Sequence, residues 1–187
     1  MMEKHSDGTL AAAIFGGGCF WCMEPVFQAL DGVIEVQPGF CGGHVESPTY
    51  EQVCRQDTGH VEVVRVRFDP ARVSYRTLLE VFFGTHDPTT LDRQGEDVGP
   101  QYASVVFFAD EGQRDQARVV RDEVQTALGV PVQTRIEPAG PFWPAEDLHK
   151  DYYRRNPEQG YCRAVIAPKL AKFRQRYTAL LRDQPRD

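Results

Sequence analysis

The stretch VEVVRVRF, residues Val61–Phe68, is the clearest strand in the chain and sets the frame for the elements around it. Because successive side chains of a strand point to opposite faces, Glu62 shares a face with Val64, Val66 and Phe68. That face is the more apolar of the two, so we expect Glu62 to head the row that points inward. A carboxylate aimed at the edge of a core is unusual. On the residues alone, a strand end that turns to solvent is the simpler interpretation.

Helices and strands are expected on both sides of this strand. Ser74 can cap a following helix, in which apolar side chains recur at helical spacing from Tyr75 to Phe82. The other expected elements are strands at 9–15, 33–40, 103–108 and 132–138 and helices at 19–30, 110–128 and 168–180. The order strand, helix, strand, strand, helix, strand is the split βαβ order. It predicts an α+β, ferredoxin-like two-layer sandwich with additional loops and a C-terminal helix, a fold that many unrelated functions share.

The length of the chain, 187 residues, is enough for one domain with its own core. We therefore expect a single catalytic domain over residues 1–187. Within it, residues 1–8 are expected to form a flexible N-terminus and residues 163–187 a C-terminal helical extension.

Charge and hydropathy narrow the classes of function. A formal charge of −6 and a pI near 5.4 argue against a nucleic-acid partner. No apolar run approaches the length that spans a membrane, so we expect no membrane association. The N-terminus is a poor secretory signal, because glycines cut off its short apolar segment. The expected location is the cytoplasm.

Cys19 comes after three glycines, at the end of an expected strand and the start of an expected helix. Unpaired backbone N–H groups and the positive end of the helix dipole favour the thiolate there. The glycines allow a sharp turn and let a substrate come close, and Phe20 and Trp21 can form an apolar wall beside the sulfur. A buried cysteine at a tight turn, next to two core aromatics, would give the same pattern. The residues alone leave both interpretations open.

Cys19 and Cys22 also form a Cys-x-x-Cys pair, a spacing that suits a thioredoxin-type redox motif or half of a zinc site. A zinc site needs a second close pair, but the other cysteines are scattered, at Cys41, Cys54 and Cys162. We expect Cys41 and Cys54 to be structural. A Cys–His hydrolase is open in principle, although no spacing selects its base among His44, His60, His86 and His149.

Four segments carry a more specific signal: GGGCFWCMEPVF, SPTYEQVCRQDTGHVEVVRVRFDP, THDPTTLDRQGEDVGPQY and GYC. In that order they resemble the hallmark segments of the A-type peptide methionine sulfoxide reductases. The resemblance runs from about Ala13 to Cys162, and several motifs in register make it far more specific than any one of them.

The resemblance implies a nucleophile and a set of acids. Cys19 matches the family's nucleophilic cysteine, whose thiolate attacks the sulfur of an oxidised methionine. The oxygen must leave protonated, and Glu62, Tyr50 and Tyr102 match the family's glutamate and two tyrosines. An ionised Glu62 would oppose thiolate formation, so we expect burial to raise its pKa and keep it neutral.

The resemblance also implies how the substrate is held and what the reaction needs. Asp97 matches an aspartate that helps to hold the substrate, and Phe20 and Trp21 match an aromatic pocket for its S-methyl group. No metal, flavin or nicotinamide cofactor is implied. The implied substrates are oxidised proteins, peptides and free methionine sulfoxide. The resemblance implies that the S-epimer of the sulfoxide is reduced and that the reaction repairs oxidative damage.

A second thiol is needed to condense with the sulfenic acid that forms on Cys19. Cys162 matches the family's usual resolving position and lies in a glycine-flanked late loop that could swing toward the site. Cys22, one helical turn from Cys19, is the alternative, and Cys162 is favoured. Many family members carry a further recycling cysteine in the tail, but none follows Cys162 here. Thioredoxin or a similar dithiol would then reduce the disulfide.

Two other functions stay open on the residues. One is a thioredoxin-like disulfide oxidoreductase that uses Cys19 and Cys22 without any sulfoxide substrate. The other is a non-catalytic ferredoxin-like module that binds a small ligand and uses its cysteines for packing.

Overall fold

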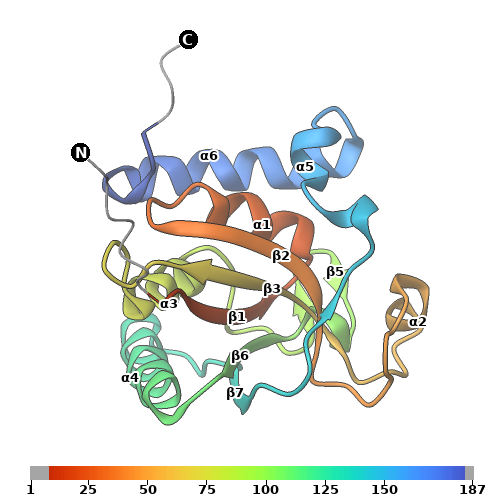
Figure 1. Cartoon of the computed structure of the whole chain (residues 1–187), viewed down its shortest axis with the longest axis horizontal. Helices are drawn as coiled ribbons and strands as arrows, with labels where there is room; N and C mark the ends of the chain where they lie inside the picture. The colour runs from red at the N-terminus through yellow and green to blue at the C-terminus, as the bar shows by residue number, and fades with distance from the viewer. Residues whose placement is uncertain (1–8, 184–187) are drawn as a thin grey trace.

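The central sheet has the split βαβ topology that the sequence predicts. A computed structural model describes residues 9–183. Its six-stranded sheet has the order β7-β6-β1-β3-β2-β8 (Figure 1). These strands are β1 (Ala11–Gly17), β2 (Val33–Cys41), β3 (Val61–Phe68), β6 (Ser104–Phe108), β7 (Arg135–Pro138) and β8 (Trp143–Pro144). Neighbouring strands are antiparallel except β6 and β7, which are parallel. The inner order β6-β1-β3-β2 is that of a ferredoxin-like sandwich, and β7 is the predicted edge strand.

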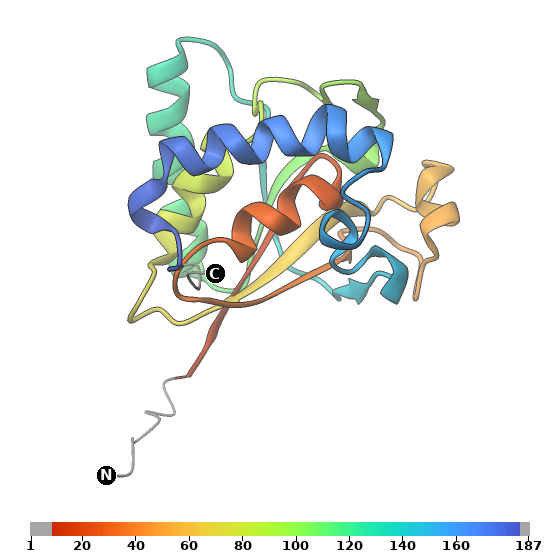
Figure 2. The same ribbon diagram turned by 90° about the horizontal axis from the view of Figure 1, so that it is seen from above.

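Four longer helices cover one side of the molecule. They are α1 (Phe20–Gln28), α3 (Tyr75–Gly84), α4 (Glu111–Leu128) and α6 (Ala167–Arg176). α3 begins where the sequence predicts, because the Ser74 side chain accepts a hydrogen bond from the Thr77 amide. α4 packs beside α3, and α6 lies over α1, as the two views in Figures 1 and 2 agree. The C-terminal helix thereby returns to the N-terminal end of the fold.

Short elements decorate the loops that surround the sheet. They are α2 (Tyr50–Cys54), α5 (Tyr152–Arg155), the hairpin β4 (Arg93–Gln94) with β5 (Asp97–Val98), 3₁₀ turns at Pro100–Tyr102, Asp147–His149 and Thr178–Leu180, and a π-helical turn at Cys162–Ile166. The sequence predicts only loops for α2 and the hairpin, since neither has a periodic apolar pattern long enough to detect.

The first half of β3 is buried on both faces, whereas Arg67 on its second face is exposed. Val64, Val66 and Phe68 join the main core, under the helices. On the other face Val61 and Val63 also have almost no exposed surface. They pack in a second cluster with Cys41, Ala103, Val105 and Phe107, which Ile14, Ala139 and Phe142 partly cover. The predicted inward direction of Glu62, Val64, Val66 and Phe68 is confirmed. Val61 and Val63 on the other face are buried as well, because a chain segment far downstream covers them.

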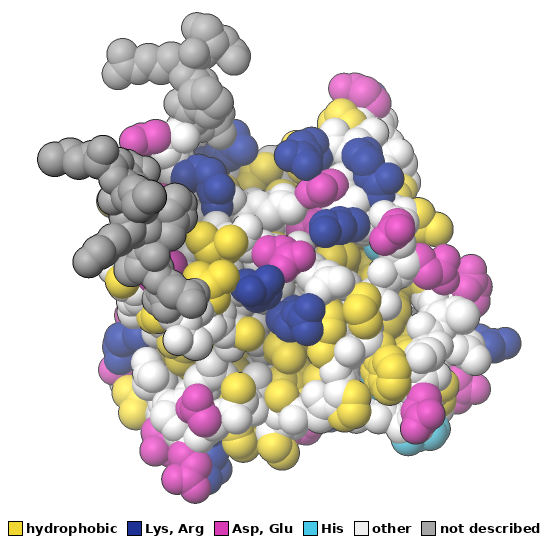
Figure 3. Space-filling view, in the orientation of Figure 1, with side chains coloured by type: hydrophobic (Ala, Val, Ile, Leu, Met, Phe, Trp, Pro, Cys, Tyr) yellow, Lys and Arg dark blue, Asp and Glu magenta, His cyan; other side chains and the backbone are white. Residues whose placement is uncertain are grey.

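The surface and the chain ends can be described briefly. On the face seen in Figure 3, Lys and Arg side chains are interspersed with Asp and Glu, and neither sign dominates. No helix within residues 9–183 is long and apolar enough to cross a membrane. The predicted flexible N-terminus, residues 1–8, lies outside the described residues, and the predicted C-terminal extension is helical through most of its described part.

Candidate active site

Cys19 lies at the junction between β1 and α1, as its N-cap residue. The chain turns there at Gly18, whose φ of +99° is a conformation that side chains with a Cβ rarely adopt. A Cβ at Gly18 would also lie 2.8 Å from the Gln94 side chain of the β4–β5 hairpin. The turn therefore requires glycine for its backbone conformation and for the close approach of the hairpin.

Glu62 reaches the same junction from β3. Its side chain is almost fully buried, with 1% of the residue exposed. One carboxyl oxygen, Oε1, accepts a hydrogen bond from the Phe20 amide at 3.2 Å. The other, Oε2, is buried without a hydrogen-bond partner among the described residues. Burial raises the pKa of Glu62 to about 8, with a smaller contribution from the charge of Asp97. The carboxyl is therefore mostly neutral at pH 7, in the direction that the sequence analysis expects.

The expectation of an acidified Cys19 is wrong for the substrate-free structure. Burial raises the pKa of the Cys19 thiol well above its ordinary value, and the hydrogen bond to Cys22 and the charge of Glu62 act in the same direction. A hydrogen bond with the Trp21 backbone favours the thiolate but does not offset them. The N-terminus of α1 therefore lowers the pKa of the Cys19 thiol too little to offset the effect of burial.

Tyr50 and Tyr102 bring two hydroxyl groups toward Glu62 from different elements. Tyr50 begins α2, and Tyr102 ends the 3₁₀ turn Pro100–Tyr102. Burial raises the pKa of both, and the charge of Glu62 is the second cause in each case. Both hydroxyls therefore keep their protons and are available as hydrogen-bond donors beside the carboxyl.

His60 holds the long loop that carries Tyr50. Its Nδ1 accepts from the Gly43 amide at 3.0 Å, which leaves Nε2 to donate to the Val45 carbonyl at 2.7 Å. The Thr58 hydroxyl accepts from the His60 amide at 3.2 Å. The loop after β2 is thus tied to the chain that enters β3.

The two aromatic residues after Cys19 differ in burial. Phe20 is fully buried and packs against Phe40 and Tyr50, whereas Trp21 is half-buried. The Trp21 indole N–H donates to His149 Nδ1 at 3.1 Å, and its ring stacks on Tyr152 at 3.7 Å between ring centroids.

His149 and Tyr152 are site residues that the sequence analysis missed, apart from naming His149 as one of several candidate bases. The only signal for them was the aromatic-rich stretch DLHKDYY, which comes more than a hundred residues after Trp21. No local pattern links the two segments, because tertiary packing alone brings them together.

Asp97 lies in the β4–β5 hairpin, where it lines a pocket and contacts Tyr161, just before the C-terminal helical segment. The Tyr161 hydroxyl donates to Asp97 Oδ2 at 2.7 Å and lies 3.3 Å from the Cys22 sulfur. The sequence analysis did not identify Tyr161, which precedes the candidate Cys162.

Cys162 does not lie in a late loop, and this part of the expectation is corrected. It begins the π-helical turn that leads into α6, and none of its surface is exposed. Its side chain packs in one cluster with Cys19, Cys22 and Ile166. The continuous helical backbone from Cys162 onward leaves no glycine-hinged segment after it. All five cysteines are free thiols.

The other sequence candidates are not assembled around Cys19. His86 Nδ1 donates to the Phe82 carbonyl, which leaves Nε2 to accept from the Ser104 hydroxyl, and none of the hydrogen bonds within residues 9–183 joins a histidine to Cys19. Within the same residues no group of three His, Cys, Asp or Glu side chains could hold a metal ion.

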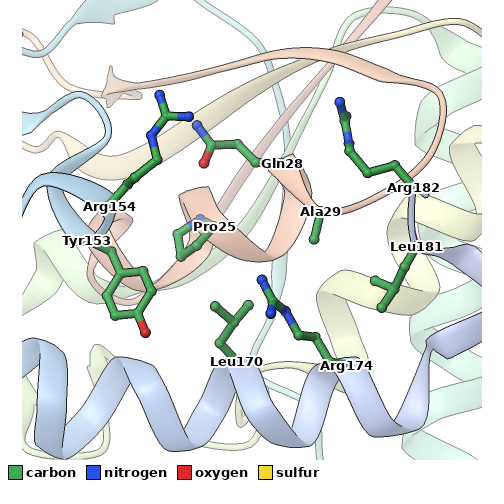
Figure 4. Close-up of a pocket in the computed structure, with 9 residues that line it drawn as sticks. All are labelled: Pro25, Gln28, Ala29, Tyr153, Arg154, Leu170, Arg174, Leu181 and Arg182. Carbon is green, nitrogen blue, oxygen red and sulfur yellow. The ribbon is translucent and has the colours of Figure 1, made fainter. Parts of the chain in front are cut away.

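Two pockets lie on either side of α6. One, of about 440 Å³, reaches both Cys19 and Cys22 and is lined by Asp97, Tyr161 and Lys169 among others. The other, of about 410 Å³, lies between α1 and α6 and is lined by Arg154, Arg174 and Arg182 (Figure 4). Since only the first pocket exposes a thiol, it is the one that matters for chemistry at Cys19.

Comparisons with known proteins point to one family. The family model described as peptide methionine sulfoxide reductase matches residues 11–181. The chain is 54% identical to peptide methionine sulfoxide reductase MsrA of Chromobacterium violaceum over 173 residues, which cover 91% of this chain and 98% of that protein. It is also 54% identical to MsrA of Deinococcus radiodurans over 187 residues, which cover 96% of this chain and 91% of that protein.

Solved structures give the same result. The structure of Saccharomyces cerevisiae Mxr1 in reduced form aligns with a TM-score of 0.79 at 30% identity, covering 85% of this chain and 92% of that one. Methionine sulfoxide reductase A of Corynebacterium diphtheriae aligns with a TM-score of 0.74 at 32% identity, covering 86% of this chain and 80% of that one.

Proposed function

Because the chain belongs to the peptide methionine sulfoxide reductase family, we propose that it reduces methionine-S-sulfoxide, peptide-bound and free, by means of Cys19. The enzyme is an oxidoreductase of that family. The finer assignments that follow rest on the neutral carboxyl of Glu62, which lies beside the thiol with one oxygen unpartnered.

The first step joins the Cys19 sulfur to the sulfoxide sulfur. The Glu62 carboxyl donates its proton to the sulfoxide oxygen, and the hydroxyls of Tyr50 and Tyr102 donate hydrogen bonds to the same oxygen. As positive character grows on the substrate sulfur, the Cys19 sulfur attacks it. The Cys19 thiol loses its proton in this step, so the raised pKa of the resting thiol is not an obstacle to a concerted transfer.

The oxygen then moves from the substrate to the enzyme. Methionine leaves with the electron pair, and Cys19 becomes a sulfenic acid whose oxygen carries the proton that came from Glu62. The proton that the Cys19 thiol loses returns to the Glu62 carboxylate, so the carboxyl is neutral again. Trp21 and Phe20 form the apolar wall for the substrate's S-methyl group, and Trp21 is held by His149 and Tyr152. Asp97 exchanges its hydrogen bond with Tyr161 for one with the substrate.

A second thiol, Cys162 or Cys22, closes a disulfide with Cys19, and thioredoxin or a similar dithiol reduces it. Thioredoxin is proposed from the family resemblance of the motifs. We also propose that the whole chain forms one catalytic domain, in which this cycle protects proteins from oxidative damage.

A single-turnover experiment tests the proposal. Reduced enzyme is mixed with one equivalent of methionine-S-sulfoxide or its R-epimer, without reductant, and methionine is quantified. We expect about one methionine per enzyme from the S-epimer and none from the R-epimer. A Cys19→Ser variant should yield none from either. Methionine from the Cys19→Ser variant, or none from the wild type, would overturn the proposal. Disulfide exchange without sulfoxide reduction would favour the thioredoxin-like alternative.

A further inference from the structure

Cys22 has surroundings unlike those of Cys19, although the two are one helical turn apart. It is 5% exposed, and its sulfur lies 3.3 Å from the Tyr161 hydroxyl. The Tyr161 hydroxyl donates to Asp97, so its proton points toward Asp97 and its oxygen faces the Cys22 sulfur. This orientation changes only when Asp97 forms a hydrogen bond with a substrate instead. The Cys19 side chain packs against Cys22 in the same cluster.

Lys169 contributes a positive charge to this cluster. It projects from α6, which lies over α1 (Figure 2), into the pocket of about 440 Å³ that also exposes Cys19 and Cys22. Lys169 is half-buried, and it forms no ion pair with any of the residues 9–183. An ammonium group without a carboxylate partner, facing two thiols, favours a thiolate among its neighbours.

The charged and titratable groups around Cys22 act in both directions. The hydrogen bond from the Cys19 thiol and the charge of Lys169 on α6 lower the pKa of Cys22, whereas burial and the charge of Asp97 on β5 raise it, and in the reduced protein the result is a pKa of about 7. Tyr161 favours the thiolate only when its proton turns from Asp97 to the sulfur. Once Cys19 is oxidised its thiol no longer donates, and the charge of Lys169 is then the main influence that favours the thiolate. Glu62 on β3 is mostly neutral, and Glu96 and Lys172 are exposed at the mouth of the pocket, where water screens their charges.

Cys162 lacks this support. It is fully buried, and burial and the charge of Cys22 both raise its pKa. A thiolate condenses with a sulfenic acid faster than a neutral thiol does. Of the two candidate resolving thiols, Cys22 is therefore the one that the structure prepares for attack.

We propose that Lys169 holds Cys22 as the thiolate that attacks oxidised Cys19, so that the first disulfide of the cycle is Cys19–Cys22 and not Cys19–Cys162. This inference rests on the proposed function, because it requires a sulfenic acid on Cys19. Lys169 acts through its charge on Cys22 and does not touch the substrate.

The proposed step balances without another reactant. The Cys22 thiolate forms the S–S bond as the S–O bond of the Cys19 sulfenic acid breaks. Cys22 is oxidised, the Cys19 sulfur is reduced, and the oxygen leaves as water with its own proton and the one that Cys22 gave up on ionising.

The test follows both half-reactions in one single turnover. Reduced enzyme reacts with one equivalent of methionine sulfoxide, and samples are quenched with an alkylating agent and digested with trypsin. Cys19 and Cys22 share the tryptic peptide 5–55, whereas Cys162 lies in the peptide 156–163. A Cys19–Cys22 disulfide therefore leaves peptide 5–55 lighter than its fully alkylated form by two alkyl groups, and fragmentation locates it, while a Cys19–Cys162 disulfide joins two peptides.

Three variants separate charge from structure. At pH 7 we expect Lys169→Met to slow disulfide formation about tenfold, with methionine release within about threefold of the wild type. The rate should return toward the wild-type value at pH 9, where Cys22 ionises without help. Lys169→Arg should restore it at pH 7. Arg174→Met is the control, because it removes a positive charge from the same helix in the other pocket (Figure 4), and its disulfide formation should match the wild type.

The outcomes are distinguishable from those of the proposed function. A first disulfide that joins peptides 5–55 and 156–163, or an unchanged rate in Lys169→Met at pH 7, would overturn the inference while leaving the sulfoxide reduction intact. Failure of the wild-type enzyme to release methionine would overturn the proposed function and this inference with it.

Discussion

At the scale of the residue, the surroundings of Glu62 keep a carboxyl group neutral without any neutralising partner. The residue is buried, and only one of its oxygens accepts a hydrogen bond. An ionised carboxylate in that position would leave a charge almost without solvation. The proton is therefore retained at pH 7, and the unpartnered oxygen is the point from which it can be given to a substrate.

This arrangement predicts a pH limit on the first half-reaction. In the wild type, methionine release in a single turnover should decline as the pH rises through about 8, because the acid form of Glu62 is lost. Glu62→Gln keeps the shape and a hydrogen-bond donor but has no proton to transfer. We therefore expect its methionine release to be about 10²- to 10³-fold slower and to show no decline near pH 8. Rapid-quench measurements between pH 6 and 9.5 check this. Glu24→Gln is the control, since Glu24 is a second buried carboxyl, which lies on α1. If methionine release by Glu62→Gln still declines near pH 8, Glu62 is not the acid.

The same group should reduce stability as the pH rises. The folded protein holds the Glu62 proton up to a pKa of about 8, whereas an unfolded glutamate releases it near 4.5. The folded state therefore binds more protons between these values, so this contribution to stability is complete below pH 4.5 and is lost as the pH approaches 8. Glu62→Gln should be more stable than the wild type by about 4–5 kcal/mol at pH 8.5, with a difference of less than about 1 kcal/mol at pH 4.5. Urea denaturation under reducing conditions at the two pH values measures it. An equal difference at both would show that the carboxyl is not held neutral.

At the scale of the element, the turn between β1 and α1 positions the nucleophile. We expect Gly18→Ala to lower stability by about 1–3 kcal/mol, because alanine is strained at a φ of +99° and its Cβ meets the Gln94 side chain. Since Cys19 follows directly, methionine release should also slow by about tenfold. Denaturant unfolding and single-turnover rates give the two quantities.

Gly129→Ala is the matched control for this prediction. Gly129 also has a positive φ, +69°, but a Cβ there has no neighbour within 4 Å. This variant should lose stability and keep its rate. A normal rate in Gly18→Ala would mean that the turn tolerates a shift without moving the sulfur.

The loop that carries Tyr50 depends on His60 in a similar way. His60→Ala removes the hydrogen bonds to Gly43 and Val45, so hydrogen exchange of residues 43–59 should quicken and kcat/KM should fall about tenfold. His44→Ala, an exposed histidine in the same loop, should change neither quantity. If exchange quickens while kcat/KM holds, Tyr50 contributes little to the reaction.

The elements also show what a sequence can predict and what it cannot. The strands, α1, α3 and α4 follow from periodicity and capping, because each signal is local to the element. The alternation of β3 and the glycines before Cys19 drew attention to Glu62 and Cys19, but only the resemblance of the motifs to a family assigned their roles. The second buried face of β3, the contact of Trp21 with His149 and the charge that Lys169 places near Cys22 depend on segments far apart in the chain. No local pattern in the sequence predicts such contacts. Burial depends on them, and burial is the reason that the pKa of Cys19 is raised rather than lowered.

At the scale of the whole molecule, the C-terminal segment closes the site and anchors to the N-terminal half. α6 packs over α1, and the Arg182 guanidinium donates to the carbonyls of Leu30 and Val33 at 3.1 and 2.6 Å. Cys162 is buried where this segment meets the thiol cluster. The molecule should therefore open as one unit, with no separate release of α6.

Thiol labelling of the substrate-free enzyme tests this unity. Cys54 is exposed and should react with a thiol reagent at once, whereas Cys162 should react only through global unfolding, with the same free energy that denaturant unfolding gives. Arg182→Ala, which removes the hydrogen bonds to two carbonyls, should lower both free energies equally, by about 1–3 kcal/mol. Mass spectrometry of the labelled peptide 156–163 follows the reaction. Labelling of Cys162 much faster than unfolding would reveal a local opening of the C-terminal segment.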